Sequence, residues 1–147
     1  MHTAEHLLNR AMVLLFGCGR AFSSHIEKKK SKCDYRFSRA LTAEETAELE
    51  KRVNAAVRAD LPVKEAFVSR EEAEGKYSLA RLPEEAGEKL RIILIGDYDA
   101  CPCIGPHAKS TGEVGAFKVI SSSFENGVLR VRFKLEEPPA TYRAAGK

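Results

Sequence analysis

Apolar side chains recur at helical spacing in two segments of the chain. In residues 2–16 the leucines and alanines fall on one side of a helix at about 100° per residue, and glycines follow directly. Thr42 and Glu45 form a capping box before a second apolar stripe, which ends near Asp60 just ahead of a proline. The spacing therefore predicts two helices, of which the second is the longer.

Several shorter stretches have the composition of strands. Residues 20–27 and 33–38 are joined by a lysine-rich link and predict a hairpin, and residues 63–68 predict a further strand. Residues 90–95 form a nearly continuous apolar run, which is typical of a strand covered on both faces. A second possible capping box predicts a short helix over residues 69–75.

The clearest hairpin pattern lies near the end of the chain. Residues 116–122 and 128–135 flank Asn126-Gly127, a pair that favours positive φ, and apolar and basic residues alternate in the second strand. One face of this hairpin is therefore expected to be core and the other to face water. The tail from about Glu136 contains adjacent prolines and small polar residues, so we expect it to fray.

Length and composition indicate one folded domain. A chain of 147 residues with 44% apolar side chains and a net charge of +3 is not a disordered polyelectrolyte. No segment has the length or flanking charges of a signal peptide or a membrane span, so we expect a cytoplasmic protein. The pattern predicts the α+β class, a single domain over residues 1–147 with helices packed on a mostly antiparallel sheet.

Two pairs of metal-binding side chains share a four-residue spacing. His2 and His6 project from one face of the first predicted helix, opposite its leucines, and Cys103 and His107 flank a turn-forming Gly-Pro pair. Thiolate and imidazole donors suit zinc better than magnesium or calcium, which prefer oxygen. A solvated helix face or turn packing explains each pair alone, but together the pairs predict one zinc site beside a cleft.

Other polar residues are candidates for supporting roles. The cysteines outside the two pairs are Cys101, a rival ligand, and Cys18 and Cys33, which we expect to be inert core thiols. The acids that are candidates to orient ligand histidines are Asp34, Asp97 and Asp99, although strand ends and turns also explain them.

Two motifs resemble a known family. Residues 2–8 (HTAEHLL) and 103–118 (CIGPHAKSTGEVGAFK) are similar to the two signatures of the editing domain shared by alanyl- and threonyl-tRNA synthetases and by free-standing editing proteins of the AlaX type. The segment between them, from residue 24 to 63, follows the family in order and spacing. Ile104-Gly105-Pro106 is closer to the threonyl version than to the Gly-Gly-Thr usual in alanyl-type members.

The resemblance implies the same α+β editing-domain fold and zinc-dependent hydrolysis, in trans, of the ester bond of a mischarged aminoacyl-tRNA. The expected substrate is seryl-tRNA(Ala) or seryl-tRNA(Thr). The family's metal set falls on His2, His6, Cys103 and His107. We expect the first three to be firm ligands, while His107 is either a fourth ligand or the group that acts on water, and His107 and His6 are the expected catalytic residues.

Two further groups of residues are expected to bind the substrate. The candidates for contact with the aminoacyl group are Ser110, Thr111, Gly112 and Asp99, of which the first three also fit a simple turn. The candidates for tRNA contact are Lys28, Lys29, Lys30 and Lys32, which also fit a solvated loop.

Two other functions compete with editing. The first is a non-catalytic module in which zinc is a closed structural site and the surface binds tRNA. The second is a zinc peptidase, because His-Thr-Ala-Glu-His also fits the H-x-x-E-H arrangement with Glu5 as the base. Without that role, we expect Glu5 to be an exposed first-turn acid that is favoured by the helix dipole.

Overall fold

The computed structural model describes residues 2–27, 30–69, 71, 89–102 and 107–136. Apart from residues 69 and 71, the short helix predicted over residues 69–75 lies outside this part of the chain, and so does the tail beyond Glu136.

The two predicted helices are confirmed. Helix α1 spans His2–Phe16 and helix α2 spans Ala43–Arg58, which makes α2 the longer by one residue. The capping box of α2 forms as predicted, because the Glu45 backbone N–H donates to Thr42 Oγ1 at 3.1 Å and the Thr42 N–H donates to Glu45 Oε1 at 2.9 Å.

A four-stranded antiparallel sheet forms the larger layer of the fold. Its order is β1-β2-β7-β6, with bounds β1 (Ser23–His25), β2 (Ser31–Arg36), β6 (Phe117–Glu125) and β7 (Val128–Leu135). The Asn126-Gly127 turn between β6 and β7 has φ of 50° and 77°, as the hairpin prediction required. Along β7, Leu129 and Val131 are buried while Arg130 is partly exposed, so the predicted alternation is confirmed.

A second, three-stranded sheet is a feature that the sequence did not predict. Its order is β3-β4-β5, with bounds β3 (Val63–Ser69), β4 (Lys89–Ile95) and β5 (Asp99–Pro102), and both pairings are antiparallel. The expected single sheet is therefore divided in two. In β4, Ile92, Ile93 and Ile95 are buried but Arg91 is partly exposed, so the strand is covered less completely than expected.

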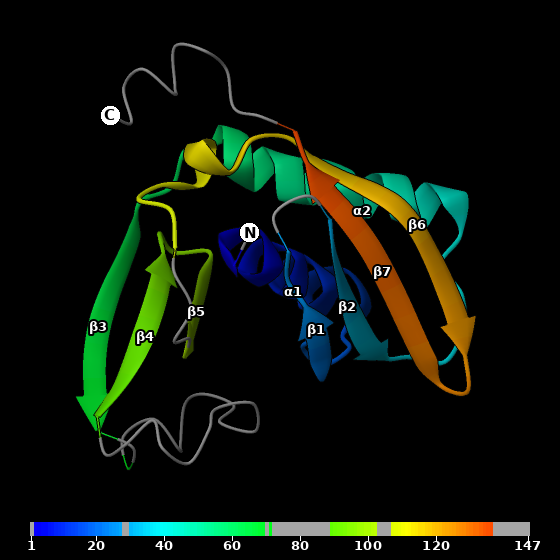
Figure 1. The fold of residues 1–147 in the computed structure, drawn as a ribbon, viewed down its shortest axis with the longest axis horizontal. Coiled ribbons are helices and arrows are strands. Elements are labelled where there is room, and N and C mark those ends of the chain that lie inside the picture. Colours follow the sequence, from blue (N-terminus) through cyan, green and yellow to red (C-terminus); the bar gives the residue numbers. More distant parts are fainter. Residues whose placement is uncertain (1, 28–29, 70, 72–88, 103–106, 137–147) are drawn as a thin grey trace.

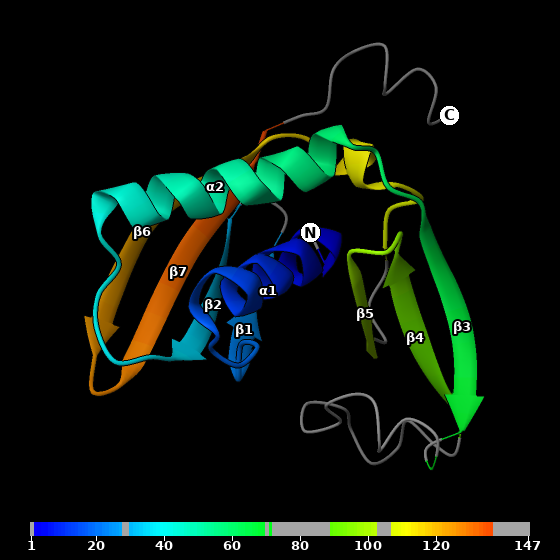
Figure 2. The same ribbon diagram turned by 180° about the vertical axis from the view of Figure 1, so that it is seen from behind.

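Helices α1 and α2 lie on the same face of the four-stranded sheet, and the N-terminal end of α1 points toward β5 of the smaller sheet (Figures 1 and 2). Helix α1 is enclosed more fully than its sequence predicts, because every residue from 3 to 9 is buried. The core between helices and sheet includes Leu7, Leu8, Tyr35 and Phe133, each fully buried. The N-terminal half of the helix is therefore largely interior, whereas residues 13–16 are partly exposed or exposed.

Thr111, at the start of the 3₁₀ helix η2 (Thr111–Val114), joins this helix to the end of α2. Its hydroxyl donates to the Ala56 carbonyl at 2.7 Å and accepts the Leu61 N–H at 2.8 Å, and the residue is fully buried. Both hydrogen-bond partners of the hydroxyl are backbone groups, so Thr111 does not present its hydroxyl to a substrate as we expected. Its role in the structure is to satisfy two buried backbone groups.

We expect Thr111→Val to lower the free energy of unfolding by about 1–3 kcal/mol, because the isosteric side chain leaves a buried carbonyl and a buried N–H unpaired. Thr111→Ser retains the hydroxyl and serves as the matched control. Urea unfolding followed by circular dichroism measures both variants, and a valine variant as stable as the wild type contradicts the structural role.

Candidate metal and substrate site

The candidate site lies where the N-terminal half of α1 faces β5 and the segment that begins at His107. His2 is partly exposed and His6 is 3% exposed, so the second histidine is an interior side chain. The rings of His6 and His107 stand edge to face with their centroids 4.7 Å apart, and the centroids of His2 and His107 are 6.1 Å apart. The convergence of these distant histidines, predicted from the two motifs, is confirmed.

Thr3 holds His107 against α1. The Nδ1 atom of His107 lies 2.9 Å from Thr3 Oγ1, which also accepts the Ala108 N–H at 3.1 Å. In the tautomer whose Nδ1–H donates to Thr3, the lone pair of the ring is at Nε2, which is the atom left for a ligand. Sequence reasoning missed Thr3, because its partners are more than 100 residues away along the chain.

The imidazole of His107 is held in its neutral form. Burial lowers the pKa of His107 to about 3, and the charges of His6 and His2 add to the effect. The buried Nε2 atom has no hydrogen-bond partner among the described residues. A neutral ring with an available nitrogen is the form of histidine that binds a metal ion.

Asp99 supports His6 from β5. Its Oδ2 atom lies 3.5 Å from His6 Nδ1, and Arg20 donates to both carboxylate oxygens at 2.9 and 3.1 Å. Burial raises the pKa of Asp99, but His6 and Arg20 more than offset it, so the pKa lies below the usual 3.8. The prediction that Asp99 lies beside a candidate ligand histidine is confirmed, whereas the part played by Arg20 had no local signal in the sequence.

The described residues supply part of the predicted metal set. Cys103 lies outside the described residues, and within them no group of three or more His, Cys, Asp or Glu side chains has the arrangement to hold a metal ion. The rival ligand Cys101 is partly exposed on β5. The three histidines have the donor type of a zinc site and His107 has the required neutral form, whereas the cysteine ligand stays a prediction.

Other predicted site residues form hydrogen bonds or ion pairs within the protein. Asp34, a candidate to orient a histidine, instead forms a bidentate ion pair with Arg130 across β2 and β7, at 2.8 and 3.0 Å. Gly112 donates its N–H to Asp60 at 3.1 Å from within the 3₁₀ helix η2, which Ser110 directly precedes. Contact of Ser110 and Gly112 with a substrate stays a prediction.

The lysines predicted to bind tRNA are only partly covered by the structure. Lys28 and Lys29 lie outside the described residues, Lys30 is exposed, and Lys32 is partly exposed on β2. Contact between the lysines and an RNA stays a prediction.

The two cysteines expected in the core differ in burial. Cys33, on β2, is fully buried as expected, whereas Cys18 is only partly buried.

Glu5 is not the exposed first-turn acid that we expected. It is 8% exposed, and its carboxylate accepts a hydrogen bond from Ser24 on β1 at 3.1 Å. The buried helix leaves no water-facing position for this side chain. A role as the base of a peptidase requires a carboxylate directed at the reacting water, and the hydrogen bond ties Glu5 to the larger sheet.

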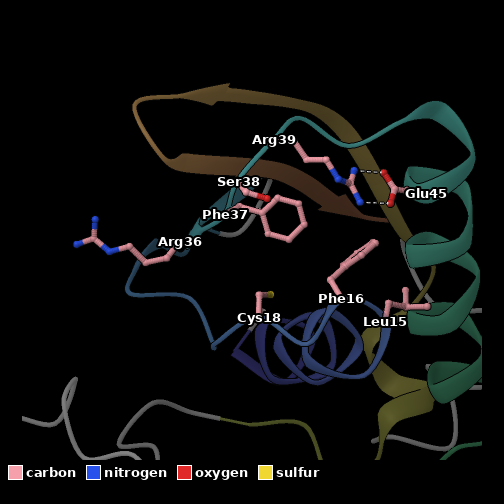
Figure 3. A pocket seen from close by; sticks show the side chains of 8 residues that line it. All are labelled: Leu15, Phe16, Cys18, Arg36, Phe37, Ser38, Arg39 and Glu45. Atoms are coloured by element: carbon pink, nitrogen blue, oxygen red, sulfur yellow. Dashed lines mark hydrogen bonds and ion pairs between the residues drawn. The ribbon is translucent and has the colours of Figure 1, made fainter.

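A surface hollow of about 580 Å³ lies beside the C-terminal end of α1 (Figure 3). Phe16 and Phe37 line it with their rings edge to face, at a centroid distance of 5.6 Å. On its rim, Arg39 donates to both oxygens of Glu45 at 2.6 and 2.7 Å and lowers the pKa of that acid to about 2. No site histidine lines this hollow, so it is separate from the candidate metal site.

Comparison with known proteins defines the class to which these features point. Residues 90–131, which include His107 and the strands on either side of it, match the family described as the threonyl and alanyl tRNA synthetase second additional domain. The resemblance indicated by the two motifs is confirmed, together with the α+β fold class. Among the described residues, no helix combines the length and the apolar character needed to span a membrane.

Individual relatives are alanine–tRNA ligases. The chain is 33% identical to that of Idiomarina loihiensis over 143 residues, which is 96% of this chain and 16% of the relative. It is 35% identical to that of Neisseria meningitidis serogroup C over 138 residues and 33% identical to that of Haemophilus influenzae over 132 residues, in each case 88% of this chain and 15% of the relative. The chain thus spans about one sixth of the length of these relatives.

In the metal-free protein, we expect Asp99→Asn to lower the free energy of unfolding by about 2–4 kcal/mol, because it leaves Arg20 partly buried without its counter-charge. A lowered pKa means that the Asp99 carboxylate stabilises the fold above pH 3.8 and that this contribution is lost as the pH falls through the folded pKa. The deficit of the variant should therefore be constant from about pH 5 to 7 and shrink below about pH 4.

Denaturant unfolding over this pH range in the presence of a chelator measures the deficit. Asp97→Asn is the matched control, because Asp97 is an exposed acid in the turn just before β5 and its loss should change stability by less than about 0.5 kcal/mol. Equal effects of the two substitutions would show that the buried ion pair does not hold this part of the fold.

Proposed function

We propose that this chain hydrolyses the ester bond of a mischarged aminoacyl-tRNA and that its substrate is seryl-tRNA(Ala). The observation that carries the proposal is the convergence of His2, His6 and His107 beside a buried carboxylate. The similarity to alanine–tRNA ligases supports a role in tRNA editing and favours the alanine acceptor over the threonine acceptor. Action in trans and a cytoplasmic location belong to the same proposal.

The proposed cofactor is zinc. His2, His6, Cys103 and His107 would hold it, a set of three imidazoles and one thiolate that zinc accepts. When bound, the metal supplies a Lewis acid that polarises an ester carbonyl or lowers the pKa of water. The neutral state of His107 and its bond to Thr3 leave Nε2 as the available ring nitrogen, which would serve either as a fourth ligand or as the group that contacts the reacting water.

Hydrolysis of the ester forms one bond to the carbonyl carbon and breaks another. The water oxygen bonds to the ester carbonyl carbon, and the bond from that carbon to the ribose oxygen breaks. The proton lost by the water passes to the ribose oxygen, so the products are free serine and a tRNA with an intact 3′ hydroxyl. His6 and His107 are the side chains that we propose to assist this transfer, and the carboxylate of Asp99 keeps the His6 ring in place.

The alternative of a non-catalytic module makes a different prediction for the same protein. In that case the four ligands close the metal site, and Lys30 and Lys32 with their neighbours bind tRNA in a salt-dependent way without hydrolysis. The enclosure of His6 is compatible with both functions, so the reaction itself is the decisive measurement.

The purified zinc-loaded chain should release serine from seryl-tRNA(Ala) faster than it releases alanine from alanyl-tRNA(Ala), with glycyl-tRNA(Ala) as a third substrate. Dialysis against a chelator should abolish the release, and added zinc should restore it. Loss of radiolabelled amino acid from acid-precipitable tRNA measures the rates. Tight, salt-dependent tRNA binding with no release from any substrate overturns the enzymatic proposal in favour of the binding module.

Cys103→Ser should reduce bound zinc from about one ion per chain to a small fraction and should slow deacylation by at least about 100-fold, since the metal contributes several kcal/mol to catalysis. Cys101→Ser is the matched control, because this neighbouring thiol is the rival ligand, and it should retain both zinc and activity. Elemental analysis gives the metal content independently of the rate. The reverse pattern, with zinc lost only from Cys101→Ser, transfers the ligand role to Cys101.

A further inference from the structure

A second hollow adjoins the histidines along α1. It has a volume of about 530 Å³ and lies between the C-terminal half of α1 and the segment 97–102, which includes β5. Arg10, Arg20, Tyr98 and Asp99 contribute to its lining. Asp99 lines the hollow and also lies 3.5 Å from His6, so this carboxylate is shared by the hollow and the candidate metal site.

Two buried polar atoms in this lining have no internal partner. Among the described residues, Arg10 Nε and Tyr98 Oη are buried without a hydrogen bond. A buried donor that is left unpaired destabilises a fold by about 1–3 kcal/mol, so such atoms in a native structure call for a partner. Both atoms can donate a hydrogen bond, and they belong to side chains that line the same hollow.

The charge of the lining singles out Arg10. Arg20 is occupied by its bidentate pair with Asp99, and the other acid of the lining, Asp97, is exposed to solvent. Arg10 forms no ion pair with a described residue. Burial raises the pKa of Tyr98, with the charge of Asp99 adding to the rise and that of Arg10 opposing it, and the side chains of Arg10 and Tyr98 line the same hollow.

The hollow in Figure 3 provides a comparison within the same molecule. There, Arg39 is bound by Glu45 (Figure 3). Arg36 stacks over the ring of Phe22, outside that view, with 4.2 Å to the centroid. Both cations of that hollow therefore have partners in the protein. In the hollow beside His6, the Arg10 guanidinium and the Tyr98 phenol have buried polar atoms without a partner among the described residues, and both can donate a hydrogen bond to an anion.

We propose that Arg10 and Tyr98 bind the 5′-phosphate of the terminal adenosine of the tRNA substrate. This inference rests on the proposed function, because the ester to be hydrolysed is on the ribose of that same nucleotide. His2, His6 and Arg10 succeed one another at four-residue spacing on one face of α1, so adjacent turns present the ester site and the phosphate site. Arginine is suited to this role because its planar fork matches two phosphate oxygens.

The binding experiment uses adenosine 5′-monophosphate, adenosine and inorganic phosphate as separate probes, measured by calorimetry on the full chain. The wild type should bind the monophosphate at least about tenfold more tightly than either of the others, and Arg10→Gln should remove that advantage. Tyr98→Phe should reduce it while leaving the fold intact. Arg58→Gln, which removes an exposed arginine from the end of α2, is the charge-matched control and should bind like the wild type.

A kinetic experiment separates this inference from the proposed function. Seryl-adenosine and its 5′-phosphorylated form carry the same ester, so the ratio of their kcat/KM values reports the phosphate alone. Arg10→Gln should lower this ratio about tenfold or more and leave hydrolysis of the unphosphorylated ester unchanged. If neither ester is cleaved, the proposed function fails, while the binding experiment still tests the phosphate site. Three results would overturn the inference. Adenosine could bind as tightly as its monophosphate, or inorganic phosphate could do so. The third result is an Arg10→Gln variant that still binds the monophosphate more tightly than adenosine.

Discussion

The buried carboxylate of Asp99 connects the two halves of this fold. It begins β5 of the smaller sheet, and its oxygens bind Arg20, which follows α1, while one of them faces His6 within α1. A carboxylate that is 7% exposed is stable in its ionised form only where positive groups replace the lost water. The same ion pair that offsets this cost therefore fixes the distance between the smaller sheet and the helix that carries the histidines.

Enclosure of α1 explains the chemistry of its polar residues. Asn9 on the buried helix accepts hydrogen bonds from the Ala21 N–H at 3.1 Å and from the Tyr35 hydroxyl at 2.8 Å, so it ties the helix to the larger sheet. On another face, His6 meets His107 and Asp99. Because the helix cannot rotate without breaking buried hydrogen bonds, the directions of its histidines are set by the sheet on one side and by β5 on the other.

Local patterns account for most of the elements and for half of the site. Apolar periodicity and capping residues predicted α1 and α2, and Asn126-Gly127 predicted the β6–β7 hairpin, because these signals act between neighbours in the chain. The four-residue spacing of His2 and His6 likewise follows from helix geometry. Division of the strands into two sheets had no such signal, since it depends on pairings such as Ile93 with Cys101 that only the folded chain defines.

The rest of the site depends on contacts that are distant in sequence. Arg20 and Asp99 are 79 residues apart and Thr3 and His107 are 104 residues apart, and none of these four residues reveals its partner through spacing. Burial also reversed two expectations, because Glu5 and Thr111 were assigned to water or substrate and instead satisfy groups inside the protein. Both errors come from treating polar side chains in an amphipathic pattern as exposed, when an enclosed helix and a tight turn require polar partners of their own.

Among the described residues, the polar atoms that the fold leaves unpaired lie close to the candidate site. Where a described polar side chain is buried for structural reasons, as with Asn9 and Thr111, the protein supplies its partners within about 3 Å. His107 Nε2, Arg10 Nε and Tyr98 Oη depart from this rule among the described residues, and all three belong to side chains at the junction of α1 with the segment from Tyr98 to His107. Among the described residues, these unpaired atoms lie at one junction, which therefore has the polarity expected of a binding site, with an electron-pair donor at one end and proton donors at the other.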